Sequence, residues 1–171
     1  MELSVHRFFS RFFSRLFSAI AACCLAFSAM AQQALPTPPS VEARAWLLLD
    51  FNSGQVLASQ NANDRFEPAS LTKLMTAYLA FSALKQKTLK PDQVIPVSTR
   101  AWKSEGSRMF IEPNKPVIVE ELLRGMIIQS GNDASVALAE AIGGSEEVFA
   151  QMMNREAKRL GLVNTNFINA T

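Results

Sequence analysis

The segment from Ser70 to about Gln86 constrains the fold most, because no Gly or Pro interrupts it. Its apolar residues recur at helical spacing, at Leu71, Leu74, Met75, Tyr78, Leu79 and Phe81. The apolar stripe is wide, so the sequence predicts a helix that is buried on most sides. Other elements must pack around such a helix.

Three further helical patterns occupy the second half of the chain, over residues 120–128, 133–142 and 145–160. The first pattern has acidic residues in its first turn, where the helix dipole favours them. The second pattern stops at Gly143-Gly144, and Ser145 is a suitable N-terminal cap for the third. This half is therefore expected to be mostly helical.

A β-hairpin is predicted before the first helix. It consists of an apolar run at Ala45–Phe51, a turn at 52–54 and a second short run at 55–58. Residues 45–49 are apolar on successive rather than alternate positions, so this strand is expected to be buried on both faces, under helices. Residues 87–117 are broken by four prolines, and a short strand is predicted at Val94–Val97.

Residues 1–31 have the layout of a secretory signal peptide, predicted to be cleaved after Ala31. Three arginines precede a charge-free apolar run at 16–29, and Ala29-Met30-Ala31 fits the small-x-small cleavage pattern. An uncleaved anchor helix and a lipoprotein with lipidated Cys23 are alternatives. The proline-rich stretch 32–43 is expected to be an extended linker, so the folded domain would span 44–171.

The body of the chain lacks several residue types that catalysis often uses. The only histidine is His6, and the only cysteines are Cys23 and Cys24. All three lie in the predicted signal peptide. Residues 32–171 therefore cannot supply a Ser-His-Asp triad, a cysteine nucleophile, a disulfide or a His/Cys zinc site. They carry 14 basic and 14 acidic residues, which gives no electrostatic reason for nucleic-acid binding. We expect no cofactor, no metal and no nucleic acid.

Ser70 and Lys73 are the first candidate catalytic pair. They are three residues apart at the start of a helix, and therefore lie on one face. The hydroxyl of Ser70 would sit near free backbone N–H groups that favour an oxyanion. Lys73 can act as a base only if burial lowers its pKa. The alternative is a serine N-cap followed by a solvated lysine.

Ser130 and Asn132 form the second candidate element, a polar corner between two apolar helices. Buried polar groups are costly unless they are satisfied, so a polar turn at this place needs a reason. Ser130 could relay a proton, and Asn132 could hold a substrate amide. The alternative is an ordinary helix–turn–helix corner.

S-x-x-K followed by S-x-N is similar to the motifs of penicillin-binding proteins and serine β-lactamases. Residues 47–80 and 119–145 resemble, more narrowly, the low-molecular-mass D-alanyl-D-alanine carboxypeptidases of serine peptidase family S11. Segments 106–110 and 161–167 are also similar to that family. A class A β-lactamase fits less well, because Ser130-Gly131-Asn132 replaces S-D-N and no Glu after Ser130 has an Asn four residues later.

The resemblance implies a role for each matching residue. Ser70 would be the acylated nucleophile, Lys73 its activating base, Ser130 the proton shuttle to the leaving D-alanine, and Asn132 a contact to the substrate peptide bond. The implied activity is removal of the terminal D-alanine from peptidoglycan pentapeptide stems, with β-lactam antibiotics as covalent inhibitors. A D-Ala-D-Ala endopeptidase of the same family is the alternative. The implied location is the periplasm.

The implied fold class is α/β (α+β), β-lactamase/transpeptidase-like, with an antiparallel sheet and a helical subdomain. No Lys-Thr-Gly, the third motif of the family, occurs in this sequence. The sequence is therefore expected to be an incomplete domain, truncated before the K-T-G strand and inactive by itself, or a non-catalytic fragment. Membrane association would depend on a C-terminal region that is not present.

Overall fold

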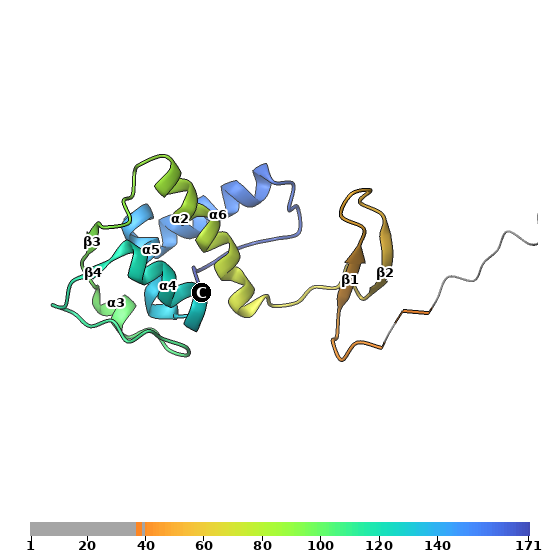
Figure 1. Ribbon diagram of the computed structural model, residues 1–171, viewed down its shortest axis with the longest axis horizontal. Helices are drawn as coiled ribbons and strands as arrows, with labels where there is room; N and C mark the ends of the chain where they lie inside the picture. Colours follow the sequence, from red (N-terminus) through yellow and green to blue (C-terminus); the bar gives the residue numbers. More distant parts are fainter. Residues whose placement is uncertain (1–36, 39) are drawn as a thin grey trace, which may run out of the picture. The chain divides into compact units, whose positions relative to one another are not determined.

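The computed structural model describes residues 37–38 and 40–171, in two compact units, Met1–Asp64 and Arg65–Thr171. The predicted signal peptide and the first part of the predicted linker lie outside the described residues. Figure 1 shows the order of the elements along the chain. Within the described part, no helix has both the length and the apolar character needed to cross a bilayer.

The first unit contains the predicted hairpin, formed by β1 (Trp46–Leu49) and β2 (Val56–Gln60). The strands are antiparallel and pair Trp46 with Gln60, with a register irregularity between Leu48 and Leu49. The connecting turn is closed by Asp50, whose Oδ1 accepts hydrogen bonds from the N–H and the hydroxyl of Ser53, both at 2.7 Å. The predicted hairpin is confirmed, and its second strand begins one residue later and ends two residues later than expected.

The predicted burial of the first strand is wrong. Leu47, Leu48 and Leu49 are each about half exposed, and Phe51 in the turn is 97% exposed. The two-stranded sheet contains only β1 and β2. A strand is buried on both faces only where other layers cover it, and one partner strand covers neither face.

The second unit is mainly helical. A 3₁₀ turn, η1 (Ala69–Thr72), leads directly into α2 (Lys73–Lys85). The remaining elements in chain order are β3 (Val94–Ile95), α3 (Thr99–Trp102), β4 (Val117–Ile118), α4 (Val119–Gln129), α5 (Asn132–Gly143) and α6 (Glu146–Arg159). The predicted helices are confirmed to within a few residues at their ends, whereas α3 and β4 had no clear sequence signal.

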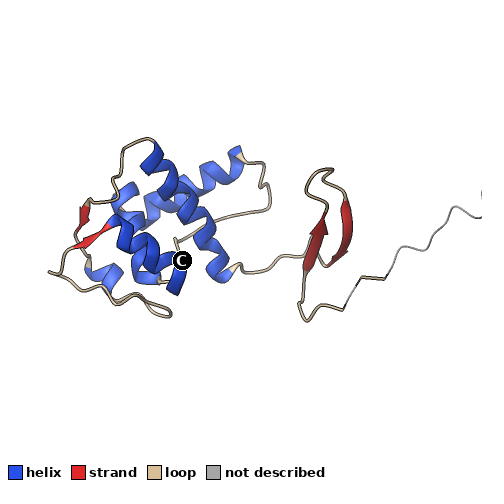
Figure 2. Cartoon of the chain, viewed as in Figure 1, coloured by secondary structure: helices blue, strands red, loops and turns tan. Residues whose placement is uncertain are grey.

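Helix α5 lies at the centre of this unit and packs against α2, α3, α4 and α6. Figure 2 shows that helices make up most of the unit. Residues 133–139 of α5 are all buried. Small residues such as Ala134, Ala137 and Ala139 let neighbouring helices approach closely on every side. One apolar cluster includes Leu122 and Leu138, and a second includes Phe149 and Met153.

Helix α2 differs from the sequence expectation in which side chains it buries. Its buried residues are Lys73, Met75, Thr76, Ala80 and Ala83. Four large apolar residues that suggested burial are 45–70% exposed, namely Leu71, Leu74, Tyr78 and Phe81. The prediction of burial on most sides is therefore wrong, because the close approach of α5 favours the face with small side chains.

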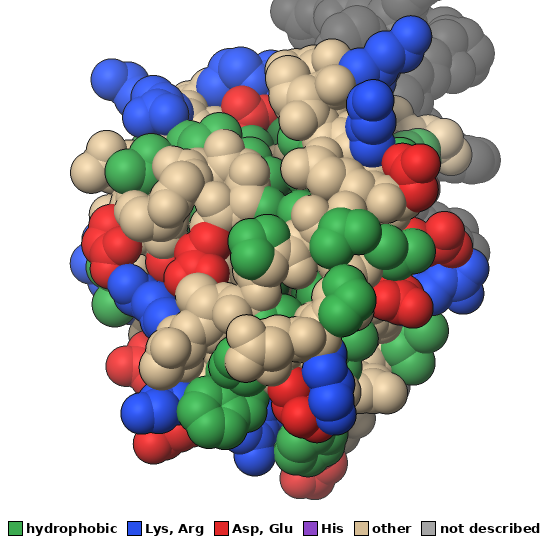
Figure 3. All heavy atoms as spheres, turned by 90° about the vertical axis from the view of Figure 1, so that its left-hand side faces the viewer, with side chains coloured by type: hydrophobic (Ala, Val, Ile, Leu, Met, Phe, Trp, Pro, Cys, Tyr) green, Lys and Arg blue, Asp and Glu red, His purple; other side chains and the backbone are tan. Residues whose placement is uncertain are grey.

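The chain end after α6 returns to the helical unit. The hydroxyl of Thr76 on α2 donates to the carbonyl of Ala170 at 2.8 Å, and the Ala170 N–H donates to Glu146 at 3.0 Å. Glu146 also forms an ion pair with Arg100 at 2.7 Å. Figure 3 shows one face of the molecule, on which basic and acidic side chains are interspersed.

Candidate active site

Ser70 lies in the 3₁₀ turn that precedes α2 and is exposed. Ala69, immediately before it, has a φ of 46°, a left-handed conformation that is uncommon for a residue other than glycine. The Leu71 N–H donates to the Pro68 carbonyl at 3.0 Å, which closes this turn. The chain thus enters the helix through a strained residue that places the Ser70 hydroxyl at the surface.

Lys73 is the first residue of α2 and only 6% of it is exposed. Its Nζ lies 3.3 Å from Ser70 Oγ, as the spacing of three residues requires. No ion pair of the described residues includes Lys73. Burial without a nearby carboxylate lowers the pKa of Lys73 from its usual value near 10.5.

Asn132 begins α5 and contacts the same lysine, although it lies 59 residues later in the chain. The Lys73 Nζ donates to Asn132 Oδ1 at 2.7 Å, and Asn132 Nδ2 donates to the Glu105 carbonyl at 2.6 Å. A side-chain amide has two N–H donors. One N–H of Asn132 therefore has no partner among the described residues and is available to a bound molecule.

Ser130 directly follows α4 as its C-terminal cap and is half-buried at the corner between α4 and α5. Its φ is 55°, again in the left-handed region, and its N–H donates to the Gly125 carbonyl. The corner is thus tightly turned, and Ser130 and Asn132 lie two residues apart within it. The side chain of Ser130 makes no hydrogen bond within the described residues.

Asp133 is the main residue that sequence reasoning missed. It is fully buried, and its carboxylate accepts the N–H groups of Met109 at 3.0 Å, Ile111 at 3.1 Å and Ala134 at 2.9 Å. The Asn132 N–H also donates to the Ser107 carbonyl at 2.7 Å. An aspartate directly after S-x-N on an otherwise apolar helix was the available signal. Together Asn132 and Asp133 fasten the loop of residues 105–111 to the candidate site.

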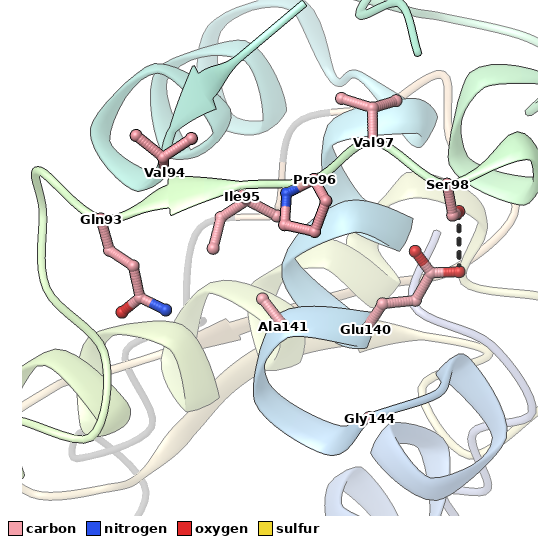
Figure 4. Close-up of a pocket in the computed structure, with 9 residues that line it drawn as sticks. All are labelled: Gln93, Val94, Ile95, Pro96, Val97, Ser98, Glu140, Ala141 and Gly144. Atoms are coloured by element: carbon pink, nitrogen blue, oxygen red, sulfur yellow. Dashed lines mark hydrogen bonds between the residues drawn. The ribbon is translucent and has the colours of Figure 1, made fainter. Parts of the chain in front are cut away.

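The helical unit has hollows on its surface, among them two of similar size. One, of about 520 Å³, is lined partly by Asn132 and Glu105 and so adjoins the candidate site. The other, of about 540 Å³, lies between the β3 segment and the end of α5 and is shown in Figure 4. In it the Ser98 hydroxyl donates to Glu140 at 2.9 Å, while the same hydroxyl oxygen caps α3 by accepting the Ala101 N–H. The Ser98–Glu140 hydrogen bond connects the start of α3 to α5, and it involves none of the four predicted site residues.

The chain matches known proteins over most of its length. Residues 31–171 match the family of D-alanyl-D-alanine carboxypeptidases, peptidase S11. The chain is 46% identical over 146 residues to D-alanyl-D-alanine carboxypeptidase DacC of Escherichia coli K12, covering 82% of this chain and 36% of DacC. It is 46% identical over 130 residues to DacF of Bacillus subtilis 168, covering 76% of this chain and 33% of DacF.

Solved structures show the same likeness. Penicillin-binding protein 5 of Haemophilus influenzae superposes with a TM-score of 0.75 at 42% identity, over 78% of this chain and 40% of that one. DacD of Francisella tularensis superposes with a TM-score of 0.74 at 39% identity, over 84% of this chain and 35% of DacD. The predicted fold class is thereby confirmed. The chain spans about a third of the length of the curated relatives named here, and it belongs to the peptidase S11 family of D-alanyl-D-alanine carboxypeptidases.

Proposed function

We propose that the protein is a serine-type carboxypeptidase that removes the terminal D-alanine from peptidoglycan stem peptides in the periplasm, during cell-wall biogenesis and remodelling. The observation that carries this proposal is the buried Lys73 amine 3.3 Å from the exposed Ser70 hydroxyl. A neutral lysine can activate a neighbouring serine without the help of a histidine. Residues 32–171 contain no histidine. The family to which the chain belongs is named for this activity.

In the proposed reaction, Ser70 Oγ attacks the carbonyl carbon of the D-Ala–D-Ala bond while its proton passes to the neutral Lys73 Nζ. The backbone N–H of Ser70 is one donor to the oxyanion that forms. When the C–N bond breaks, the departing D-alanine nitrogen takes a proton through the Ser130 hydroxyl. The free N–H of Asn132 donates to a carbonyl of the peptide, and water then hydrolyses the ester at Ser70.

The environment of Lys73 supports its role as a base. In the ammonium form Nζ donates to Ser70, whereas in the amine form the Ser70 hydroxyl can donate to the lone pair of Nζ. Burial favours the amine form and lowers the pKa of Lys73. The rate of acylation is therefore expected to rise with pH and to level off above a pKa that lies below 10.5.

The test uses the full-length gene product, a fluorescent penicillin and a synthetic pentapeptide that ends in D-Ala-D-Ala. We expect covalent labelling and D-alanine release from the unmodified protein, and neither from Ser70→Ala. Lys73→Arg keeps the positive charge but not the base, so acylation should fall by about 10²-fold or more. Ser82→Ala, the same change farther along α2, is the matched control and should label normally.

Mass spectrometry of the labelled protein locates the modified residue. A penicillin adduct on a serine other than Ser70 would contradict the assignment of the nucleophile. Near-normal acylation of Lys73→Arg would contradict the assignment of the base. Preferential cleavage of a cross-linked peptide dimer over the pentapeptide would favour the endopeptidase alternative.

A further inference from the structure

The loop of residues 105–111 presents an arginine beside the candidate site. The guanidinium carbon of Arg108 lies 4.9 Å from the centre of the Phe110 ring. A cation over an aromatic face is attracted by the negative charge of the ring's π-system. The ring itself is 70% exposed. Burial in a core therefore does not explain why Phe110 occupies this position.

The backbone holds Phe110 in a conformation that bulky residues rarely adopt. Its φ is 64°, in the left-handed region, which costs free energy for a residue with a large side chain. The N–H groups on either side of it, those of Met109 and Ile111, are both held by the buried carboxylate of Asp133. Met109 also packs so tightly against Gly125 that a Cβ there would lie 2.2 Å from its sulfur. The ring is thus fixed as a rigid support for Arg108.

Arg108 has no carboxylate partner within residues 37–38 and 40–171. Other arginines of the helical unit do form ion pairs, such as Arg100 with Glu146 and Arg124 with Glu120. A guanidinium that is held by a ring but not neutralised can still bind a carboxylate through two parallel N–H donors. The arrangement therefore suits an anionic group that arrives from outside the chain.

The hydrogen bonds place Arg108 near the path of a peptide at the candidate site. Asn132 bonds Lys73 through its side chain and the Ser107 carbonyl through its backbone N–H. Residue 108 is therefore adjacent to a residue that is hydrogen-bonded to Asn132. A bound peptide whose carbonyl accepts a hydrogen bond from the free N–H of Asn132 would have its N-terminal part close to the loop of residues 105–111.

We propose that Arg108, supported by Phe110, binds a carboxylate of the stem peptide on the N-terminal side of the D-Ala–D-Ala bond. The loop thereby selects peptides with an acidic group at that place. This inference rests on the proposed function, because it concerns the substrate of the same site. It assigns Arg108 a role in substrate choice and none in the proton transfers.

The test compares two penicillins whose acyl side chains differ by one carboxylate, carbenicillin with it and benzylpenicillin without it. The measured quantity is the second-order rate of acylation of the full-length gene product. Arg108→Gln should lower the rate with carbenicillin about tenfold, the effect of losing one charged hydrogen-bonding partner. The rate with benzylpenicillin should change less than about twofold, since that side chain has no carboxylate for Arg108 to bind.

Two further variants complete the design. Phe110→Ala removes the support and should lower the rate with carbenicillin by about threefold, a loss of the size expected for an exposed cation–π contact. Arg124→Gln removes the same charge from α4 and should leave the ratio of the two rates unchanged. An unchanged ratio in Arg108→Gln, or an equal fall for both penicillins, overturns the inference. If neither penicillin acylates the unmodified protein, the proposed function fails and this inference fails with it.

Discussion

The hairpin and the helical unit contain similar apolar residues but differ in how these are buried. Leu47, Leu48 and Leu49 of β1 are about half exposed, whereas Leu122 and Phe149 of the helical unit are fully buried. Both regions satisfy their backbone hydrogen bonds locally, β1 with β2 and the helices within themselves. The difference shows that a local pattern is enough to form an element, while burial requires neighbours from elsewhere in the chain.

The difference has an energetic consequence. Burying a leucine or phenylalanine side chain contributes about 1.5–3 kcal/mol, and residues at the centre of the helical unit obtain this contribution fully. A two-stranded hairpin without a covered face is only marginally stable in water, and its exposed apolar side chains promote association with other chains. Matched substitutions in the two regions measure this difference.

The largest expected effect compares one substitution in the two regions of a polypeptide of residues 32–171. Leu122→Lys places a charge in the apolar cluster and should unfold the helices, at a cost of about 4 kcal/mol or more. Leu48→Lys lies on a half-exposed strand and should change the helical circular dichroism little while reducing aggregation. Circular dichroism and light scattering measure both effects. Equal loss of helical signal in both variants would contradict the comparison.

A smaller effect tests the tight packing beside the candidate site. Gly125→Ala introduces a Cβ that would lie 2.2 Å from the Met109 sulfur, and overpacking of this kind costs about 1–3 kcal/mol. Truncating the obstructing side chain in a Gly125→Ala, Met109→Ala double variant should recover part of the loss. Urea denaturation followed by circular dichroism provides the free energies of unfolding. Simple additivity of the two substitutions would show that they do not interact.

The smallest effect concerns Lys73, a buried lysine that forms no ion pair among the described residues. The unfolded chain keeps the ordinary lysine pKa near 10.4, whereas burial lowers the pKa in the folded chain. Between the two pKa values the unfolded state holds more protons, so the free energy of unfolding rises with pH, by at most about 1.4 kcal/mol per pH unit. Lys73→Met lacks this contribution.

Urea denaturation of both proteins between pH 7 and pH 10 measures the difference. The unmodified protein should gain stability relative to Lys73→Met as the pH increases. Below the folded pKa the cost of the buried charge is fully present, and the two curves should run parallel. A difference that shrinks as the pH rises would mean that the folded state stabilises the charged form of Lys73.

Much of the secondary structure was predictable, because periodicity and end signals are local properties. Gly144, with a φ of 81°, ends α5, and the Ser145 hydroxyl accepts the Val148 N–H at the start of α6. The burial of α2 was not predictable from its apolar residues. Leu71 and Leu74 are about 70% exposed, while Thr76 and Ala80 are fully buried. Side-chain size at the contact with α5, rather than hydrophobicity alone, decided which face is covered.

The sequence by itself determined that Ser70 and Lys73 share one side of a turn, because their spacing of three residues sets that geometry wherever the helix lies. It also identified the Ser130–Asn132 corner as a polar break between apolar helices. Only the tertiary structure decided that Asn132 meets Lys73 across 59 residues and that Asp133 holds the loop of residues 105–111. These contacts depend on how α2, α4 and α5 pack, and packing is a property of side chains brought together from distant parts of the chain.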